Sequence, residues 1–234
     1  MPLKRILRIL ALDTASSRGS VALLQGQEIL AELKLYTLRT HSTDLLRSID
    51  FLLGRLGWEL QDLDLVASGI GPGSFTGIRI GIATALGIAQ SLSIPFAGVS
   101  GFEAIARQAA FLDGHIGVLL NAQRLQVFYA EYISRKGKIH PARKPSLILL
   151  SDLERYLADR HLYIVGDCDV RGTTEWDGSC MGWPRRVAAD LFLAPSIGRS
   201  ALLEKRKWRS GEYLKCDPLY IRPPDALRKK AGGR

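Results

Sequence analysis

The sequence predicts an α/β fold, in which a mixed β-sheet is flanked by helices and the chain forms two lobes. Two observations carry this prediction. Three extended apolar segments come first, and helices then alternate with further strands. The chain has 234 residues, 47% hydrophobic and 24% charged, which is an ordinary composition for a globular protein with a sizeable core.

The first half of the chain shows strand and helix signals in a regular order. Apolar runs bounded by turn residues predict strands at Ile6–Asp13, Ser20–Leu24, Ile29–Leu35, Leu63–Ala67 and Pro95–Val99. Helical spacing of apolar side chains predicts helices over Thr43–Leu56, between Gly77 and Ile94, and over Phe102–Ala110. This order of elements is that of the ribonuclease H-like, or actin-like, half-domain.

The second half gives weaker signals after a break at Asp113-Gly114. We expect an N-terminal actin-like lobe over 1–112, a smaller or degenerate actin-like lobe over 113–222, and a mobile basic tail over 223–234. The elements predicted there are a hairpin (Ile116–Leu120 and Gln126–Ile133), a basic connection (Arg135–Lys144), strands at Leu147–Leu150 and Leu162–Val165, helices at Asp152–Ala158 and Ile197–Trp208, and an extended Leu219–Ile221. The segment Cys168–Pro184 matches no pattern.

A glycine-rich turn, Gly71–Gly77, joins a predicted strand to the second predicted helix. Such a turn directs backbone N–H groups at one point beside the positive end of a helix dipole, which is anion-binding geometry. Its glycine spacing is neither a dinucleotide fingerprint nor a P-loop. The alternative is a tight turn capped by Thr76, with glycines placed for positive φ or close packing. The candidate anion or nucleotide site comprises Asp13, Thr14, Gly71, Gly73, Ser74 and Thr76.

Asp13 ends the first predicted strand and allows two interpretations. An acid there can orient a metal-bound water beside a nucleotide phosphate, or it can cap the following turn through backbone N–H groups. The histidines do not support a metal site, because the residue one helical turn after His41 is Leu45.

The second predicted helix has a ridge of small side chains at four-residue spacing: Gly77, Gly81, Ala85 and Ala89. No charged residue lies between Arg79 and Glu103, so the helix is expected to be buried on nearly every side. One side would lie on the sheet, and the other would meet a helix of this chain or of another protein. A membrane span is not expected, because Gln90, Ser91 and Pro95 interrupt the apolar window.

The chain carries a formal net charge of +9, which favours contact with nucleic acid or another polyanion. Its three cysteines form no C-x-x-C pair, and this fits reduced thiols in the cytosol. We therefore expect a cytoplasmic protein.

Several segments together resemble the TsaB family, also called YeaZ. They are ILALDTASSRGSVALL, THSTDLL, ASGIGPGSFTGIRIGIATALGIAQ and PFAGVSGFEAIA, with looser agreement at FYAEY (Phe128–Tyr132) and DPLYIR (Asp217–Arg222). The resemblance implies an actin-like, two-lobed fold. It also implies a scaffold or activating subunit for threonylcarbamoyl transfer to adenosine 37 of tRNA, which binds and orders a TsaD-like catalytic subunit.

The resemblance further implies a non-catalytic protein with no metal or cofactor of its own. A TsaE-like ATPase would join the complex and use ATP there, tRNA would be bound through the complex, and the chain alone would form a homodimer. Pairing in the family uses the first two helices of each partner. The implied partner interface is Leu45, Ile49, Leu52, Leu56, Gly77, Gly81, Ala85 and Ala89. Gly81→Leu would then abolish pairing and leave the fold largely intact.

The sequence departs from the family at Asn121, Gln123 and Gln126, where the resemblance implies Asp, Arg and Glu. These changes would weaken a nucleotide or partner contact made by the acid. Two other functions stay open: an actin-like ATP-hydrolysing phosphotransferase using Asp13 and the Gly71–Gly77 turn, and a stand-alone tRNA-binding module.

Overall fold

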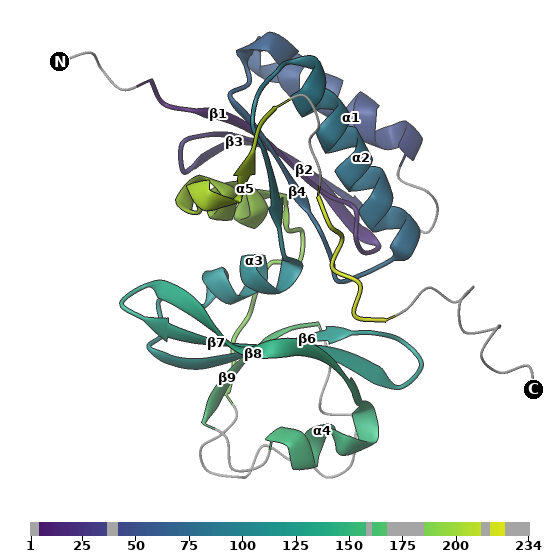
Figure 1. Ribbon diagram of the computed structural model, residues 1–234, viewed down its shortest axis with the longest axis vertical. Helices are drawn as coiled ribbons and strands as arrows, with labels where there is room; N and C mark the ends of the chain where they lie inside the picture. The colour runs from purple at the N-terminus through teal and green to yellow at the C-terminus, as the bar shows by residue number, and fades with distance from the viewer. Residues whose placement is uncertain (1–4, 37–41, 158–160, 168–184, 212–215, 223–234) are drawn as a thin grey trace, which may run out of the picture. The chain divides into compact units, whose positions relative to one another are not determined.

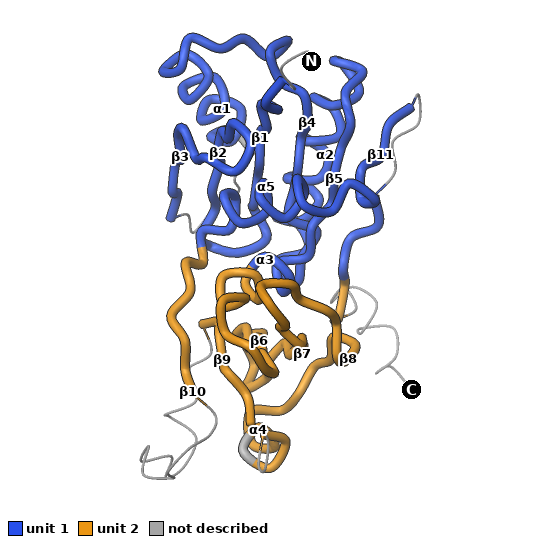
Figure 2. The backbone as a smooth tube through the Cα atoms, turned by 90° about the vertical axis from the view of Figure 1, so that its left-hand side faces the viewer, with its two compact units in different colours: residues 1–104, 192–219 blue, residues 105–191, 220–234 orange. Residues whose placement is uncertain are grey.

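The computed structural model describes residues 5–36, 42–157, 161–167, 185–211 and 216–222. The chain divides into two compact units, which are residues 1–104 with 192–219, and residues 105–191 with 220–234 (Figure 2). The expected lobes over 1–112 and 113–222 are thus corrected. The first unit gives way to the second after residue 104, and the chain returns to the first unit after residue 191. The predicted tail, 223–234, the unassigned 168–184 and His41 lie outside the described residues.

The first unit contains a six-stranded mixed sheet (Figure 1), and its strand order, β11-β5-β4-β1-β2-β3, can be followed in Figure 2. Its strands are β1 (Arg8–Asp13), β2 (Arg18–Gln25), β3 (Glu28–Tyr36), β4 (Leu65–Gly69), β5 (Phe96–Val99) and β11 (Trp208–Arg209). β1 pairs antiparallel with β2 and parallel with β4, with Leu10 opposite both Leu23 and Val66. This arrangement of three antiparallel strands followed by parallel ones is the predicted actin-like half-domain.

Helices cover both faces of this sheet. They are α1 (Ser42–Leu56), α2 (Phe75–Ser91) and α5 (Ala194–Leu203). A short 3-10 turn (Leu60–Asp62) follows α1 in the chain, and α3 (Gly101–Gln108) follows β5. Leu10 and Leu12 of β1 pack in one core with α1 and α2, whereas Ala11 faces Gly198 of α5. Burial on both faces explains why β1 is apolar at successive positions instead of alternating.

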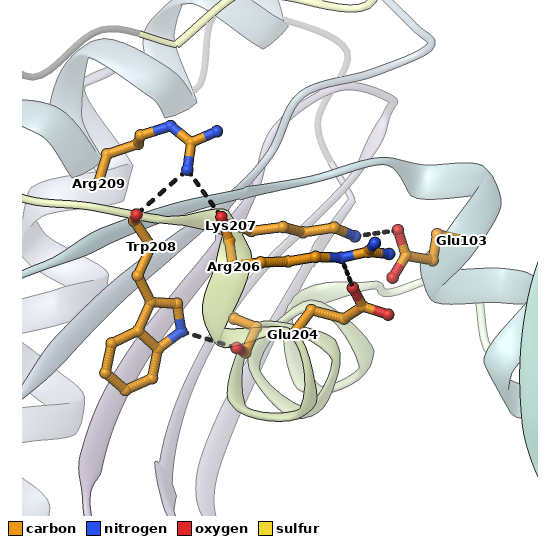
Figure 3. A network of polar contacts seen from close by, with 7 residues as sticks. Glu103, Glu204, Arg206, Lys207, Trp208 and Arg209 are labelled. Atoms are coloured by element: carbon orange, nitrogen blue, oxygen red, sulfur yellow. Dashed lines mark hydrogen bonds and ion pairs between the residues drawn. The ribbon is translucent and has the colours of Figure 1, made fainter.

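The predicted helix Ile197–Trp208 ends early, at Leu203. Glu204 leaves helical geometry at φ −114° and ψ 62°, and the chain continues as a 3-10 turn, Lys205–Lys207, into β11. Figure 3 shows why this edge is held: Trp208 Nε1 donates to the Ala201 carbonyl at 2.8 Å, and Lys207 pairs with Glu103. Arg206 Nε lies 2.6 Å from a Glu204 carboxylate oxygen, and Lys205 Nζ lies 5.5 Å from the centre of the Trp208 ring, so each cation of this turn has a contact within the first unit.

The second unit contains a five-stranded sheet in the order β10-β9-β6-β7-β8. Its elements are β6 (Gly114–Asn121), β7 (Gln126–Arg135), β8 (Lys138–Leu149), α4 (Leu150–Leu157), β9 (Leu162–Gly166) and β10 (Arg185–Arg186). The predicted β6–β7 hairpin is confirmed.

The expected basic connection Arg135–Lys144 is wrong, because most of it belongs to the long strand β8. The chain reverses at Lys136-Gly137, where both residues have positive φ, and β8 then pairs with β7 along its length. Cations are compatible with this strand because it lies at the sheet edge and keeps one side in water. Leu219–Ile221, predicted to be extended, forms no strand.

Among the described residues, no helix combines the length and the apolar character needed to cross a bilayer.

Candidate functional site

The glycine-rich turn meets the turn after β1 through one backbone and one side-chain hydrogen bond. Ser74 N–H donates to the Ala15 carbonyl at 2.7 Å, and Thr14 Oγ1 donates to the Gly77 carbonyl at 2.7 Å. The cap of α2 is Ser74, whose side chain accepts the Gly77 N–H at 3.3 Å. The predicted cap, Thr76, is therefore corrected.

Two glycines of the turn allow this close approach. A Cβ at Gly73 would lie 2.1 Å from the Ala15 carbonyl oxygen, and one at Gly77 would lie 2.1 Å from the Thr14 carbonyl oxygen. Real Cβ atoms do not come that close to backbone atoms, so any larger residue would push the two turns apart. The close-packing interpretation of these glycines is thus sufficient to explain them.

Asp13 lies at the same place and is 2% exposed. Its Oδ1 accepts the Ala15 N–H at 3.3 Å, and a Cβ at Gly69 would lie 2.4 Å from that oxygen. Burial raises the pKa of Asp13 to about 7, against a smaller lowering by the hydrogen bonds from Ala15 and Thr14. The carboxyl therefore caps its own turn and is protonated more readily than an ordinary aspartate.

The predicted nucleotide-site residues are thus brought together in part. Asp13, Thr14, Gly73 and Ser74 converge where β1 ends and α2 begins, whereas Gly71 (φ +108°) lies against Ile78 and the Leu219 carbonyl, and Thr76 is exposed. Anion binding here stays a prediction. Among the described residues, no group of three His, Cys, Asp or Glu side chains has the arrangement of a metal site.

The predicted partner interface lies largely inside the first unit. The small ridge of α2, Gly77, Gly81, Ala85 and Ala89, is buried. Leu45, Ile49 and Leu52 of α1 are 1–4% exposed and Leu56 is partly buried, all packed in the core of the first sheet. The assignment of these side chains to a partner surface is therefore corrected, because the chain's own sheet covers them.

The expectation that Gly81→Leu preserves the fold is also corrected. A Cβ at Gly81 would lie 2.5 Å from Thr14 Oγ1 and 3.3 Å from Ser68 Oγ. Both atoms belong to buried residues at the ends of β1 and β4, which leave a leucine no room.

The opposite sides of α1 and α2 are open, and that of α1 carries the charged residues Arg47, Asp50 and Arg55. The apolar and small residues on these open sides form what we call the outer face: Leu46, Phe51, Gly54, Ala83 and Gly87. Leu46 and Phe51 are 55% and 57% exposed, and a Cβ at Gly54 or Gly87 would meet no atom within 4 Å. Because α1 and α2 pack against one face of the sheet, these sides both point away from it. This face was not predictable from the sequence, because the more regular apolar stripe of each helix is the one that packs on the sheet.

The β6–β7 turn carries the three departures from the family pattern. Asn121 Oδ1 accepts the Gln123 N–H at 2.7 Å, and the Asn121 N–H donates to Asp167 Oδ1 at 2.7 Å. Gln126 Oε1 accepts from Arg222, which ends the DPLYIR segment. The side chains of Asn121 and Gln126 therefore take part in polar contacts within the second unit, and Gln123 contributes its backbone N–H.

Comparisons with known proteins agree with the resemblance in the sequence. A family model described as "TsaD: tRNA N6-adenosine threonylcarbamoyltransferase" matches residues 35–164, more than half of the chain. TsaB of Buchnera aphidicola subsp. Schizaphis graminum is 34% identical over 149 residues, which are 62% of this chain and 70% of that protein. The chain belongs to the TsaB family.

Other TsaB proteins match over a similar length. Identity is 32% over 152 residues to TsaB of Bacillus subtilis and 39% over 149 residues to TsaB of Escherichia coli. These alignments cover 65% and 63% of this chain, and 66% and 64% of the two relatives. The TsaB-family chain thus matches slightly less than two thirds of either relative.

Two solved structures from Pseudomonas aeruginosa share the fold. One is described as an uncharacterized protein with similarity to peptidase YEAZ, with a TM-score of 0.71 at 25% identity over 93% of this chain and 100% of that one. The other, YeaZ, has a TM-score of 0.70 at 24% identity over 88% of this chain and 96% of that one. The α/β fold predicted for this TsaB-family chain is confirmed.

Proposed function

We propose that this TsaB-family chain is a scaffold subunit in the biosynthesis of threonylcarbamoyladenosine in tRNA. It binds a TsaD-like catalytic subunit and orders it, without making or breaking bonds itself. Family membership supports the pathway, since the matched TsaB proteins are named for it. The observation that carries the scaffold role is the outer face, which leaves two large apolar side chains in water.

The outer face has the chemistry of a helix-to-helix interface. Burying a Leu or Phe side chain is worth about 1.5–3 kcal/mol, so covering Leu46 and Phe51 together favours association substantially. Gly54 and Gly87 are open, and Ala83 is small, so the backbones of partner helices can approach closely. Two helices of the TsaD-like subunit would complete a four-helix contact, and a second copy of this chain would cover the face when the partner is absent.

The contacts between the turn after β1, at Asp13, and the glycine-rich turn support a structural role for the latter. The carbonyl oxygens of Thr14 and Ala15 lie against the glycine-rich turn and the start of α2, and Asp13 accepts a hydrogen bond from its own turn. In this proposal the complex obtains its ATP chemistry from a TsaE-like subunit, and tRNA reaches it in the cytoplasm.

Reconstitution tests the proposed pathway. The chain is co-expressed with the TsaD and TsaE relatives of its host, and modified tRNA is measured with each subunit omitted in turn. We expect modification only when all are present, and co-purification of this chain with the TsaD relative. Full modification without this chain would contradict the proposal.

Substitutions on the outer face test the scaffold mechanism. Phe51→Glu and Gly87→Glu are expected to weaken pairing with the TsaD relative at least about 100-fold, because each places a charge in an apolar interface. Pairing is measured by titration, and thermal unfolding checks that each variant is folded.

Leu203→Glu is the matched control, since Leu203 is 61% exposed on α5, which covers the other face of the sheet. It should pair normally. By size-exclusion with light scattering, the unmodified chain alone should be a dimer and Phe51→Glu a monomer. Normal pairing by both outer-face variants would overturn the assignment of this face.

A further inference from the structure

The edge of the second sheet carries a basic hairpin. Its five cations, Arg135, Lys136, Lys138, Arg143 and Lys144, are all exposed. The sequence contains no acid between Glu131 and Asp152. We call this set the basic edge, and it accounts for a large share of the chain's net charge of +9.

Two carboxylates approach the basic edge, and each is already engaged. Asp113 Oδ1 accepts the Lys136 backbone N–H at 2.7 Å. Glu131 is 5% exposed, and its carboxylate contacts His115 Nδ1 at 2.8 Å, Tyr129 Oη at 2.9 Å and Arg143 Nε at 3.2 Å. Within the described part of the chain, Arg135, Lys138 and Lys144 have no ion pair, so their charges are available to a ligand.

Protection of a sheet edge from aggregation does not require this much charge of one sign. The edge strand β3 of the first sheet offers an internal comparison, since it mixes Glu28 and Glu32 with Lys34. β8 is longer than β3, and all of its charged side chains are cationic. The difference points to a polyanionic ligand for β8.

The backbone of β8 argues against an added β-strand as that ligand. Pro141 and Pro145 lie within the strand and have no N–H to donate. Binding would therefore run through the side chains. At about 3.3 Å per residue, Lys138 and Lys144 lie roughly 20 Å apart along the strand, enough to reach several phosphates of one nucleic-acid backbone.

We propose that the basic edge binds the phosphate backbone of RNA. The inference rests on the proposed function, which supplies tRNA as the RNA present in the complex. Exposed lysines make sequence-independent phosphate contacts, so the basic edge would add affinity and not choose the tRNA.

Binding of an unmodified tRNA transcript by the full chain, alone and in the reconstituted complex, tests this. The variant Lys138→Gln/Lys144→Gln should bind about 5- to 20-fold more weakly at 100 mM salt, and its log–log salt slope should fall by about 1.5 to 2. Lys205→Gln/Arg206→Gln removes the same charge from the 3-10 turn of the first unit, where Arg206 pairs with Glu204 (Figure 3) and Lys205 lies over the Trp208 ring. This variant should bind nearly as the unmodified chain does.

Equal losses in both double variants would mean a general charge effect and would overturn the proposal. Unchanged tRNA binding by Lys138→Gln/Lys144→Gln would also overturn the proposal. This variant could still pair with the TsaD relative and support modification. In that case the proposed function stands without this surface. Preferential binding of the basic edge to anionic lipid vesicles, with tRNA unaffected, would also overturn it. Absence of modification in the complete mixture would instead count against the proposed function.

Discussion

Gly77→Ala is expected to destabilise the first unit by about 3 kcal/mol or more. The new methyl group would be built 2.1 Å from the Thr14 carbonyl oxygen, and that atom belongs to backbone fixed between β1 and α2. Backbone cannot move aside as a flexible side chain does, so the turn after β1 and the start of α2 would have to separate. Urea unfolding measures the change.

Gly87→Ala makes the same substitution in the same helix and is the control. A Cβ at Gly87 meets no atom within 4 Å, so the change should follow helix propensity alone. Alanine is favoured over glycine by about 1 kcal/mol in a helix, and this variant should be equal or more stable. Similar effects of the two substitutions would show that the contact with Thr14 is not tight.

Asp13→Asn is expected to stabilise the chain at pH 8. Burial raises the pKa of Asp13 from 3.8 to about 7, so the folded chain holds a proton that the unfolded chain releases. The stabilisation that the protonated Asp13 carboxyl gives the folded chain is therefore complete below pH 3.8. It is lost as the pH rises through 7. A shift of this size corresponds to at most about 4 kcal/mol, and asparagine keeps the oxygen that accepts the Ala15 N–H.

Unfolding free energies at pH 5 and pH 8 test this as a difference between the two proteins. The gain from Asp13→Asn should be roughly a third as large at pH 5 as at pH 8, because pH 5 lies about a third of the way from 3.8 to 7. A loss of stability at pH 8 would contradict the account of a buried carboxyl capping its own turn. Steady ATP turnover by the unmodified chain, abolished in Asp13→Asn, would favour the phosphotransferase alternative instead.

The first sheet and its helices were predictable from sequence because each element is long, periodic and bounded by turn residues. Gly57 and Gly26, for example, have the positive φ that the helix end and the hairpin require. β8 was not predictable in the same way, because its cations and prolines match a loop and only pairing with β7 makes it a strand. The four-residue spacing of small side chains on a helix also does not indicate which element of the protein packs against them. Gly77 and Gly81 looked suited to a neighbouring helix, yet Thr14 is the residue they contact.

The division of the first unit between two distant parts of the chain has a consequence for synthesis on the ribosome. Residues 1–104 emerge first, but α5, which covers one face of their sheet, belongs to residues 192–219. At about 5–20 residues per second, the intervening residues 105–191 take roughly 4–17 s to translate. During that interval the nascent sheet is uncovered on one side, so this protein is expected to depend on chaperones more than one whose units are contiguous.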